Sequence, residues 1–207
     1  FFSGVTEGNI GTERIINMLN IVDDNLVVEE KGIYSIEKFL IARRLMYWQV
    51  YLHKTVVSAE NMLIKALKRA KYLMMNNKEI FTTPSLALFL KNNFTSSDFN
   101  ENPDLLLNFA ELDDNDIYTC LKYWKNENDF VLSNLSSMIL NRRILKIKVQ
   151  KTDFKQTEID EKVNEFSKRN KISNEEAQYF IFSNKVSNST YNIEKANINI
   201  LMKTGEV

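Results

Sequence analysis

Apolar side chains recur at helical spacing over most of the first two thirds of the chain. The longest stretch without Pro or Gly runs from Tyr34 to Met75. Because Pro and Gly most often end a helix, this stretch predicts one continuous helix, or two helices that meet near residues 55–58. The second alternative arises because Thr55, Val56 and Val57 are three β-branched residues in a row, which lowers local helix propensity.

The second half of this stretch combines an apolar stripe with a row of cations. The stripe comprises Leu63, Ala66, Leu67, Ala70 and Met74. The cations, which lie mostly off the stripe, are Lys65, Lys68, Arg69 and Lys71. We therefore expect the stripe to face a core and the cations to form a solvated face rather than a nucleic-acid patch.

Shorter segments complete the helical part. Helix start signals and apolar spacing predict helices near residues 12–19, 84–90, 103–107, 117–124 and 129–141. Thr12 is the expected N-cap of the first, and Asp113 with its acidic neighbours is expected to cap the helix at 117–124. Residues 91–102 are polar and predict a loop.

Alternation of apolar and polar residues marks the remaining segments. β-branched residues on both sides of Asp23-Asp24-Asn25 predict a hairpin within residues 20–30. Residues 145–149, 179–182 and 198–200 predict short strands that pair with one another, and residues 157–170 predict a helix. The chain is therefore expected to be mainly α, with a helical domain over residues 1–150 and a small C-terminal α+β appendage over residues 151–207.

Composition narrows the functional classes. Lys and Arg together number 27, as do Asp and Glu, so no overall positive field favours nucleic acid or an anionic membrane. Polar residues interrupt every apolar run before it reaches the roughly 18 to 20 residues that span a bilayer. Cys120 is the only cysteine, which excludes an internal disulfide and a cysteine-based zinc site. We expect a soluble protein of the reducing cytoplasm.

A polar and aromatic cluster lies at the centre of the long helical stretch, at Arg43, Tyr47, Tyr51, His53 and Lys54. On one continuous helix, Arg43, Tyr47 and Lys54 would lie within about 40° of one another, flanked by Tyr51 and His53. Arg offers a planar fork of donors, Lys a mobile charge and His a titratable donor, so the set suits a polyphosphate. The alternative is an ordinary amphipathic helix with surface cations and tyrosines at the core boundary.

Several catalytic centres are excluded by residue type. One histidine and one cysteine cannot form a zinc tetrad, and the chain has neither a phosphate-binding P-loop nor a nucleophile elbow. Asp113, Asp114 and Asp116 fit helix caps better than metal ligands. These 207 residues therefore contain no self-sufficient catalytic centre.

The segment from Tyr34 to Thr55 resembles the part of HD-domain phosphohydrolases that lies downstream of their metal site. In the deoxynucleoside triphosphate (dNTP) triphosphohydrolase branch, an Arg is followed eight residues later by a Tyr-x-His-Lys motif. This chain has Arg43 followed by Tyr51-Leu52-His53-Lys54. Weaker similarities lie at residues 1–8, 112–117 and 141–143, so the resemblance extends over residues 1–148.

The resemblance implies a fold and a role for the cluster. The fold would be a portion of an HD-domain-type helical bundle with a long central helix. Arg43, His53 and Lys54 would contact the triphosphate. Tyr51 would lie against the deoxyribose and disfavour a ribose 2′-hydroxyl, with Tyr47 and Gln49 as pocket neighbours. The reaction would convert a dNTP and water into a deoxynucleoside and triphosphate.

The family's metal site limits this expectation. A chain with one histidine cannot form the His…His-Asp…Asp ligand set, so the metal, such as Mn, Mg or Fe, would be held by the rest of the HD domain, N-terminal to Phe1. We expect the chain to be the C-terminal part of a longer enzyme, to bind no cofactor itself and to be inactive alone. The resemblance also implies a homo-oligomer. The alternatives are a noncatalytic nucleotide-binding or helical interaction and regulatory module, and a scaffold without a ligand.

Overall fold

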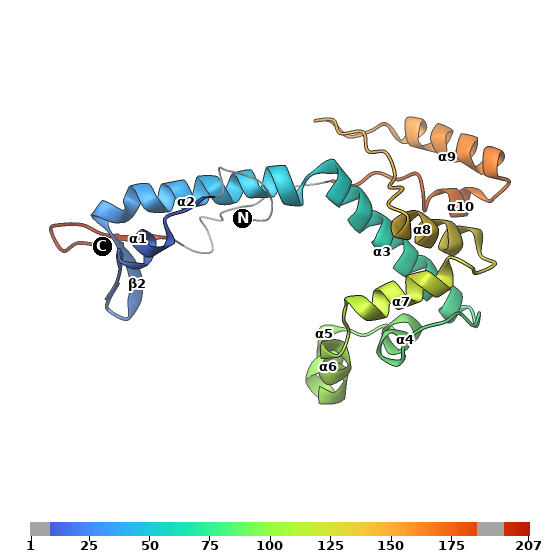
Figure 1. The fold of residues 1–207 in the computed structure, drawn as a ribbon, viewed down its shortest axis with the longest axis horizontal. Coiled ribbons are helices and arrows are strands. Elements are labelled where there is room, and N and C mark those ends of the chain that lie inside the picture. Colours follow the sequence, from blue (N-terminus) through green and yellow to red (C-terminus); the bar gives the residue numbers. More distant parts are fainter. Residues whose placement is uncertain (1–8, 186–196) are drawn as a thin grey trace. The chain divides into compact units, whose positions relative to one another are not determined.

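The computed structural model describes residues 9–185 and 197–207, which are mainly helical, as the sequence predicts. They fall into two compact units, whose elements are drawn along one ribbon in Figure 1. The first unit contains the described residues up to Val56 together with Lys185 and residues 197–207. The second unit contains Val57–Asn184. The similarity noted at residues 1–8 lies outside the described residues.

A small sheet forms one end of the first unit. α1 (Thr12–Ile16) leads into β1 (Leu19–Val22), which pairs antiparallel with β2 (Asn25–Glu29). Asp23 and Asp24 form the turn with φ of 49° and 60°, the left-handed values that a two-residue type I′ turn requires. The predicted hairpin is therefore confirmed. The expected cap of α1 is wrong, because Gly11 occupies the N-cap position and Thr12 is already helical.

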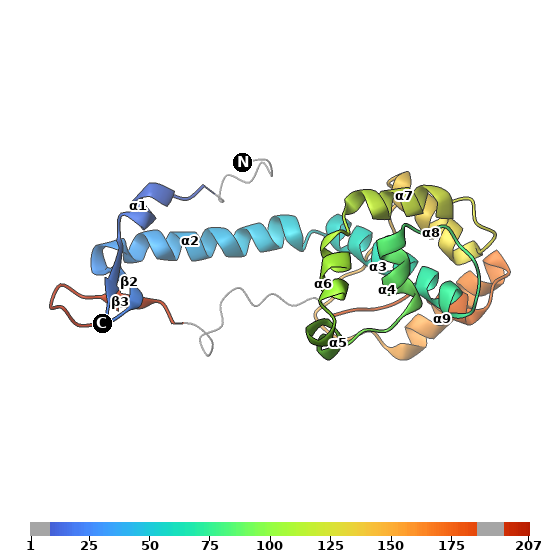
Figure 2. The ribbon, with the colours of Figure 1, turned by 90° about the horizontal axis from the view of Figure 1, so that it is seen from below.

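The third strand of the sheet comes from the C-terminal region. β3 (Asn199–Leu201) pairs in parallel with β2, with Val27 opposite Asn199, and the two lie side by side in Figure 2. A strand at this place was predicted, but its predicted pairing with other C-terminal strands is wrong. Residues 151–207 thus supply β3 to the first unit and the helices α9 (Gln156–Asn170) and α10 (Asn174–Ala177) to the second.

The strand predicted at residues 145–149 does not form. Leu145 is held instead on the helix α3 (Lys54–Met75), where its N–H contacts Met62 Sδ at 3.3 Å. Its carbonyl oxygen accepts a hydrogen bond from Ser58 Oγ at 2.7 Å. Among the residues described, no strand pairs with residues 145–149. The alternation of apolar and charged residues is therefore present here without the backbone hydrogen bonds of a sheet.

The strand predicted at residues 179–182 is also absent, because these residues turn back after α10. Phe180 packs into the helical core, with its ring centroid 5.1 Å from that of Phe166 and 6.0 Å from that of Phe130. Its burial, at 6% exposed, accounts for an apolar run that resembles a strand.

The predicted long helix is two helices. α2 (Ile33–Met46) follows the short 3-10 turn η2 (Glu30–Gly32) and continues into a π-helical turn, η3 (Tyr47–Tyr51). Leu52, with φ −97° and ψ 12°, leaves helical geometry, and α3 begins at Lys54. The single continuous helix is therefore wrong. The two-helix alternative is correct, with its junction at residues 52–53 rather than 55–58.

Close contacts attach the start of α2 to the sheet. A Cβ atom on Gly32 would lie 2.8 Å from Met18 Cβ and 2.9 Å from Val28 Cγ1, so only glycine permits this approach. Arg14 Nε also donates to Ser35 Oγ at 3.1 Å, which links α1 to α2. These contacts hold the N-terminal end of the helix that carries the predicted cluster.

The second unit is a helical assembly around α3. Its further helices are α4 (Pro84–Lys91), α5 (Ser96–Glu101), α6 (Pro103–Ala110), α7 (Asp114–Trp124) and α8 (Phe130–Leu140). Met62, Ala66, Ala70 and Leu73 of α3 are at most 1% exposed and pack into one core with residues of α7 and α8. The predicted stripe on α3 therefore faces the core, although Leu63, Leu67 and Met74 lie at its edge. None of the helices that the structure describes combines the length and the hydropathy of a bilayer-spanning segment.

The cationic row on α3 is not a uniformly solvated face. Lys68 is exposed, but Arg69 is only 9% exposed and donates to Asp129 at 2.6 Å and to Glu176 at 3.2 Å. Lys71 donates to backbone carbonyl oxygens at the end of α4. The prediction fails because long cationic side chains on a helix can reach acceptors on neighbouring elements beyond the apolar stripe.

Capping boxes begin two helices, of which one was predicted and the other was not. Asp113 accepts hydrogen bonds from the N–H groups of Asn115 and Asp116, which confirms it as the cap of α7. Thr95 and Asp98 form the same motif at the start of α5, within the segment predicted as a loop. The Thr-x-x-Asp spacing is the signal that should have indicated a helix there.

Candidate functional site

The first unit contains an open hollow at the C-terminal end of α2. Its lining residues are Arg43, Met46, Tyr47 and Tyr51, and its volume is about 370 Å³. Ligand pockets in proteins measure about 300 to 1,000 Å³, so the hollow could admit part of a nucleotide. Three of the five predicted site residues therefore lie together. Met46, which contributes to the lining, was not predicted because a methionine among apolar residues carries no chemical signal.

Arg43, Tyr47 and Tyr51 form a ladder along successive turns. An Arg43 guanidinium N–H donates a long hydrogen bond to Tyr47 Oη at 3.5 Å, and the guanidinium carbon lies 5.4 Å from the Tyr47 ring centroid. The Tyr47 and Tyr51 ring centroids are 5.2 Å apart, with the planes tilted by 52°. Spacing by four residues on one helix side brings such groups together. The ladder presents one cation beside two aromatic rings.

The π-helical turn interrupts the regular α-helical spacing of the cluster residues between Tyr47 and Lys54. The Leu52 N–H donates to the Tyr47 carbonyl oxygen at 2.7 Å, a bond to the fifth preceding residue. A π turn holds one residue more than an α turn and is often found at functional sites. The angles calculated for a continuous α-helix therefore do not apply to His53 and Lys54, and the predicted stripe of Arg43, Tyr47 and Lys54 does not exist in that form.

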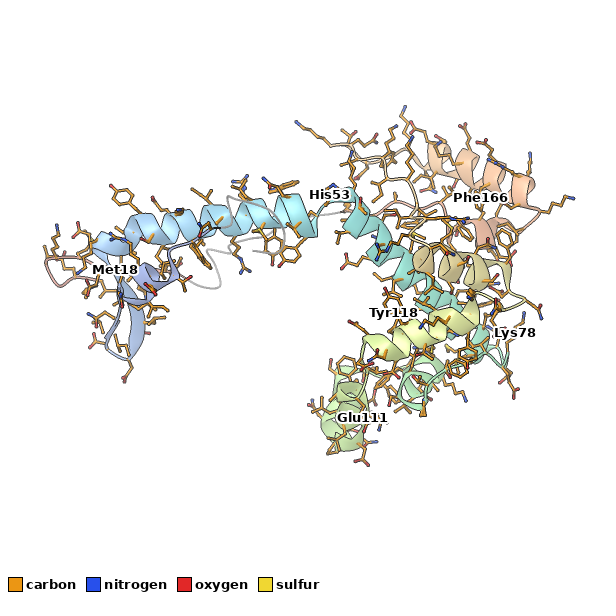
Figure 3. The ribbon with its side chains drawn as sticks, in the orientation of Figure 1. Met18, His53, Lys78, Glu111, Tyr118 and Phe166 are labelled. Carbon is orange, nitrogen blue, oxygen red and sulfur yellow. The ribbon has the colours of Figure 1, made fainter. Side chains whose placement is uncertain are left out.

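His53 marks the start of α3 and is labelled at that point in Figure 3. Its Nδ1 accepts a hydrogen bond from the Thr55 N–H at 3.3 Å. The imidazole thus satisfies one of the backbone donors that a helix start leaves without a partner. Because Nδ1 accepts this bond, Nε2 carries the proton of the neutral ring and remains available to donate to a ligand.

Lys54 is the first residue of α3 and is exposed, as is His53. Neither residue lines the hollow, and the predicted neighbour Gln49 is exposed and does not line it either. The N–H groups at the first turn of a helix favour an anion nearby. Lys54 therefore stands at a position suited to a phosphate, although the structure does not join it to the hollow.

The cations of the cluster carry no internal counter-ion. Within the described part of the chain, Arg43 and Lys54 form no ion pair, whereas Arg69 is paired with two carboxylates. An exposed guanidinium without a carboxylate can accept a phosphate as a fork of donors. Among the described residues, no carboxylate lines the hollow, and its cation and two tyrosine rings support binding and charge stabilisation.

The described residues do not fit a metal site of the HD type. Over residues 9–185 and 197–207, no group of three or more His, Cys, Asp or Glu side chains is placed to hold a metal ion. The full sequence also has a single histidine. Chemistry at a metal is therefore not assigned to the residues of this chain.

Comparisons with known proteins agree with the segment that carries the cluster. Residues 10–83 match the family described as HD associated region. The crystal structure of a phosphohydrolase from Bacteroides thetaiotaomicron matches with a TM-score of 0.89 and 49% identity, covering 98% of this chain and 50% of that one. The uncharacterized protein YwfO of Bacillus subtilis is 31% identical over 144 residues, which are 70% of this chain and 31% of YwfO.

The chain thus spans half of the solved phosphohydrolase and less than a third of YwfO. All five predicted site residues lie inside the matched region of residues 10–83. Sequence identity of 49% over nearly the whole chain places the solved phosphohydrolase close to it. The chain is therefore related to HD phosphohydrolases, and its residues 10–83 correspond to their HD associated region.

Proposed function

We propose that this chain supplies the phosphate and sugar contacts of a metal-dependent dNTP triphosphohydrolase. The observation that supports the proposal most is Arg43, an exposed cation beside the rings of Tyr47 and Tyr51, within the HD associated region. It has no counter-ion among the residues that the structure describes. A cation next to aromatic surface is what a nucleotide with its charged phosphates and apolar sugar face requires.

Each residue has a separate role in this proposal. Arg43 donates to phosphate oxygens, and its contact with Tyr47 restricts where the guanidinium lies. Tyr51, 56% exposed, offers its ring to the deoxyribose, where a 2′-hydroxyl would be crowded. His53 donates from Nε2, and Lys54 adds a mobile charge beside the first N–H groups of α3. Donors aimed at phosphate oxygens stabilise the charge that develops on them during hydrolysis.

The attacking water and the metal belong to another part of a longer protein in this proposal. The chain spans 50% of the solved phosphohydrolase that it matches, and no group of three or more His, Cys, Asp or Glu in its described ranges is placed to hold a metal ion. We therefore propose the remainder of the HD domain as its partner, a dNTP as its ligand and a homo-oligomer as its assembly. The 207-residue chain by itself is expected to release no triphosphate.

The test uses the full-length protein that contains this chain, supplied with Mn²⁺ and each dNTP. Triphosphate release is measured through the deoxynucleoside formed with it, which is separated from the remaining dNTP and quantified. Arg43→Ala should lower kcat/KM about 100-fold, as loss of a donor to developing charge does in other enzymes. Arg44→Ala is the matched control, because Arg44 is also exposed and is next in sequence but does not line the hollow.

Further variants assign the individual contacts. Lys54→Ala should also lower kcat/KM, and Tyr51→Ala should raise the relative turnover of ribonucleoside triphosphates. Wild-type turnover in both Arg43→Ala and Lys54→Ala would refute the site. Nucleotide binding by the full-length protein without any hydrolysis, lost in Arg43→Ala, would favour the noncatalytic nucleotide-binding module instead.

A further inference from the structure

The segment after α8 has the sequence of a β-strand but no strand partner. Leu145 is bonded to α3, and residues 146–151 then form no backbone hydrogen bonds within the part of the chain that the structure describes. Leu145 and Ile147 are partly buried, whereas Lys146 and Lys148 are exposed. This alternation of exposure is the period of two that an extended strand produces.

An unpaired strand edge exposes a row of N–H and C=O groups, which can bind another extended segment. Residues 146–151 thus carry backbone donors and acceptors that make no backbone hydrogen bond to residues 9–185 or 197–207. Val149, 66% exposed, adds an apolar side chain at the same place. Strand addition obtains affinity from such main-chain groups and specificity from alternate side chains.

The charge of the segment limits what could pair with it. Six cations, Arg142, Arg143, Lys146, Lys148, Lys151 and Lys155, lie within residues 142–155, where Asp153 is the single acidic residue. The chain as a whole has a net charge of zero, so this concentration is local. A second copy of the segment would bring like charges opposite one another, which destabilises a strand pair. An acidic strand would place opposite charges there.

A nucleic acid is a weaker candidate than an acidic strand. It would use the lysines but would leave the row of backbone groups and the apolar Ile147 and Val149 without a role. A protein strand uses all three features. We propose that residues 146–151 become a β-strand when they pair with an extended, acidic segment of a partner protein.

The test uses the 207-residue chain and a short fluorescent peptide in which Glu alternates with Val. Binding is followed by fluorescence anisotropy, and backbone protection by amide hydrogen exchange. We expect saturable binding, together with slower exchange at alternate amides of residues 146–151. Replacing both Lys146 and Lys148 with Gln should weaken binding at least tenfold. Lys122→Gln with Lys125→Gln, at two exposed lysines in and just after α7, should leave it unchanged.

Two proline variants separate strand pairing from simple charge attraction. Successive N–H groups of a strand point to opposite edges, so only one of Val149→Pro and Gln150→Pro removes a bond to the peptide. Both residues are exposed and uncharged, so neither change disturbs the core. The variant that removes this bond should bind the peptide on the order of tenfold more weakly, which corresponds to the free energy of about one hydrogen bond. The other variant should bind with nearly unchanged affinity.

Three results would overturn the proposal. The first is that the chain does not bind the peptide. The second is that both proline variants bind the peptide as tightly as the unsubstituted chain does. The third is that the chain binds a single-stranded oligonucleotide more tightly than the peptide, and that neither proline substitution changes this binding. Concentration-dependent self-association through residues 146–151, detected by analytical ultracentrifugation and lost in the Lys146 and Lys148 double variant, would assign the edge to a second copy instead.

Discussion

Arg69 and Asp129 illustrate how a single pair of residues can support a whole unit. The two side chains are each 11% exposed, and three N–H to carboxylate contacts of 2.6 to 3.2 Å join them. Asp129 also accepts the Leu132 N–H at 2.9 Å and so caps α8. One carboxylate therefore neutralises a buried charge on α3 and begins a second helix.

Replacing Asp129 tests this double role. Asp129→Asn keeps an acceptor for the cap but leaves the charge of Arg69 with Glu176 alone, so the free energy of unfolding should fall by about 3 kcal/mol. Urea denaturation monitored by circular dichroism measures it. The paired variant Arg69→Met with Asp129→Asn removes both charges and should lose less than the single variant. A larger loss in the double variant would mean that the pair itself, rather than its neutrality, provides the stability.

The same pair predicts how stability depends on pH. Burial alone would raise the pKa of Asp129, but the hydrogen bonds from Arg69 and the Leu132 N–H outweigh it and lower that pKa. A carboxylate with a lowered folded pKa contributes stability above its unfolded value of about 3.9, and this contribution is lost as pH falls through the folded pKa. The unsubstituted chain should therefore lose more unfolding free energy between about pH 5 and pH 3 than Asp129→Asn does. Parallel losses in the two proteins would contradict this assignment.

At the scale of elements, the junction between α2 and α3 depends on His53. The Thr55 N–H donates to Nδ1, so the neutral ring should carry its proton on Nε2. Nitrogen NMR of the imidazole at pH 8 can read this tautomer directly, because the chain has one histidine and the signal needs no assignment. A neutral ring protonated on Nδ1 would show that His53 does not cap α3, and would remove Nε2–H as a donor for phosphate.

The hairpin offers a second test at this scale. Asp23 and Asp24 both have positive φ, which costs an ordinary residue about 1 kcal/mol and costs glycine little. Asp24→Gly should therefore stabilise the β1–β2 turn by up to about 1 kcal/mol, since Asp-Gly is favoured in type I′ turns. Hydrogen exchange of the Asn25 and Val27 amides, which face β1 in the hydrogen-bonded pairs of the hairpin, should slow. Asp24→Ala is the control and should accelerate exchange, because alanine tolerates a positive φ less well than aspartate does.

Several elements could be predicted because their signals are local. The hairpin follows from β-branched residues around Asp23-Asp24, and the cap of α7 follows from Asp113. The pairing of β3 with β2 joins residues more than 170 positions apart, and no local pattern encodes it. A junction between two helices was predicted as an alternative, but at residues 55–58 rather than 52–53, because the actual break needs neither Pro nor Gly and precedes the β-branched residues. A side-chain acceptor on His53 and a π turn produce it instead.

In the candidate site, too, the features that depend on local spacing could be predicted and the others could not. Arg43 of α2 and Tyr47 and Tyr51 of η3 are spaced by four residues and lie together, as helical spacing predicts, because that spacing is a local property. His53 and Lys54 were placed by extending that spacing across a junction where it does not hold. Their part in binding a triphosphate thus rests on resemblance to a family and remains a prediction.

At the scale of the whole molecule, the two units differ in how much apolar surface each buries in its own core. The large buried cluster that includes Met62, Leu73 and Trp124 lies entirely within residues 62–180 of the second unit. In the described part of the first unit, the buried apolar side chains are Val27, Val28 and Ala42. Many large apolar side chains there are exposed instead, among them Tyr34 at 81% and Trp48 at 58%. Hydrophobic burial is the main stabilising contribution to folding, so the units should differ in independent stability.

This difference predicts the behaviour of isolated segments. A segment of residues 57–184 should fold alone and unfold cooperatively in urea, because it contains the core and the Arg69 pair with both carboxylates. Residues 9–56 should not, since their three buried apolar side chains cannot offset the conformational entropy of ordering the segment. Tryptophan fluorescence separates the two outcomes, because the second unit holds Trp124, which is fully buried and donates to the Phe81 carbonyl oxygen at 2.7 Å. A broad transition with solvent-exposed emission from residues 57–184 would show that the core requires the first unit.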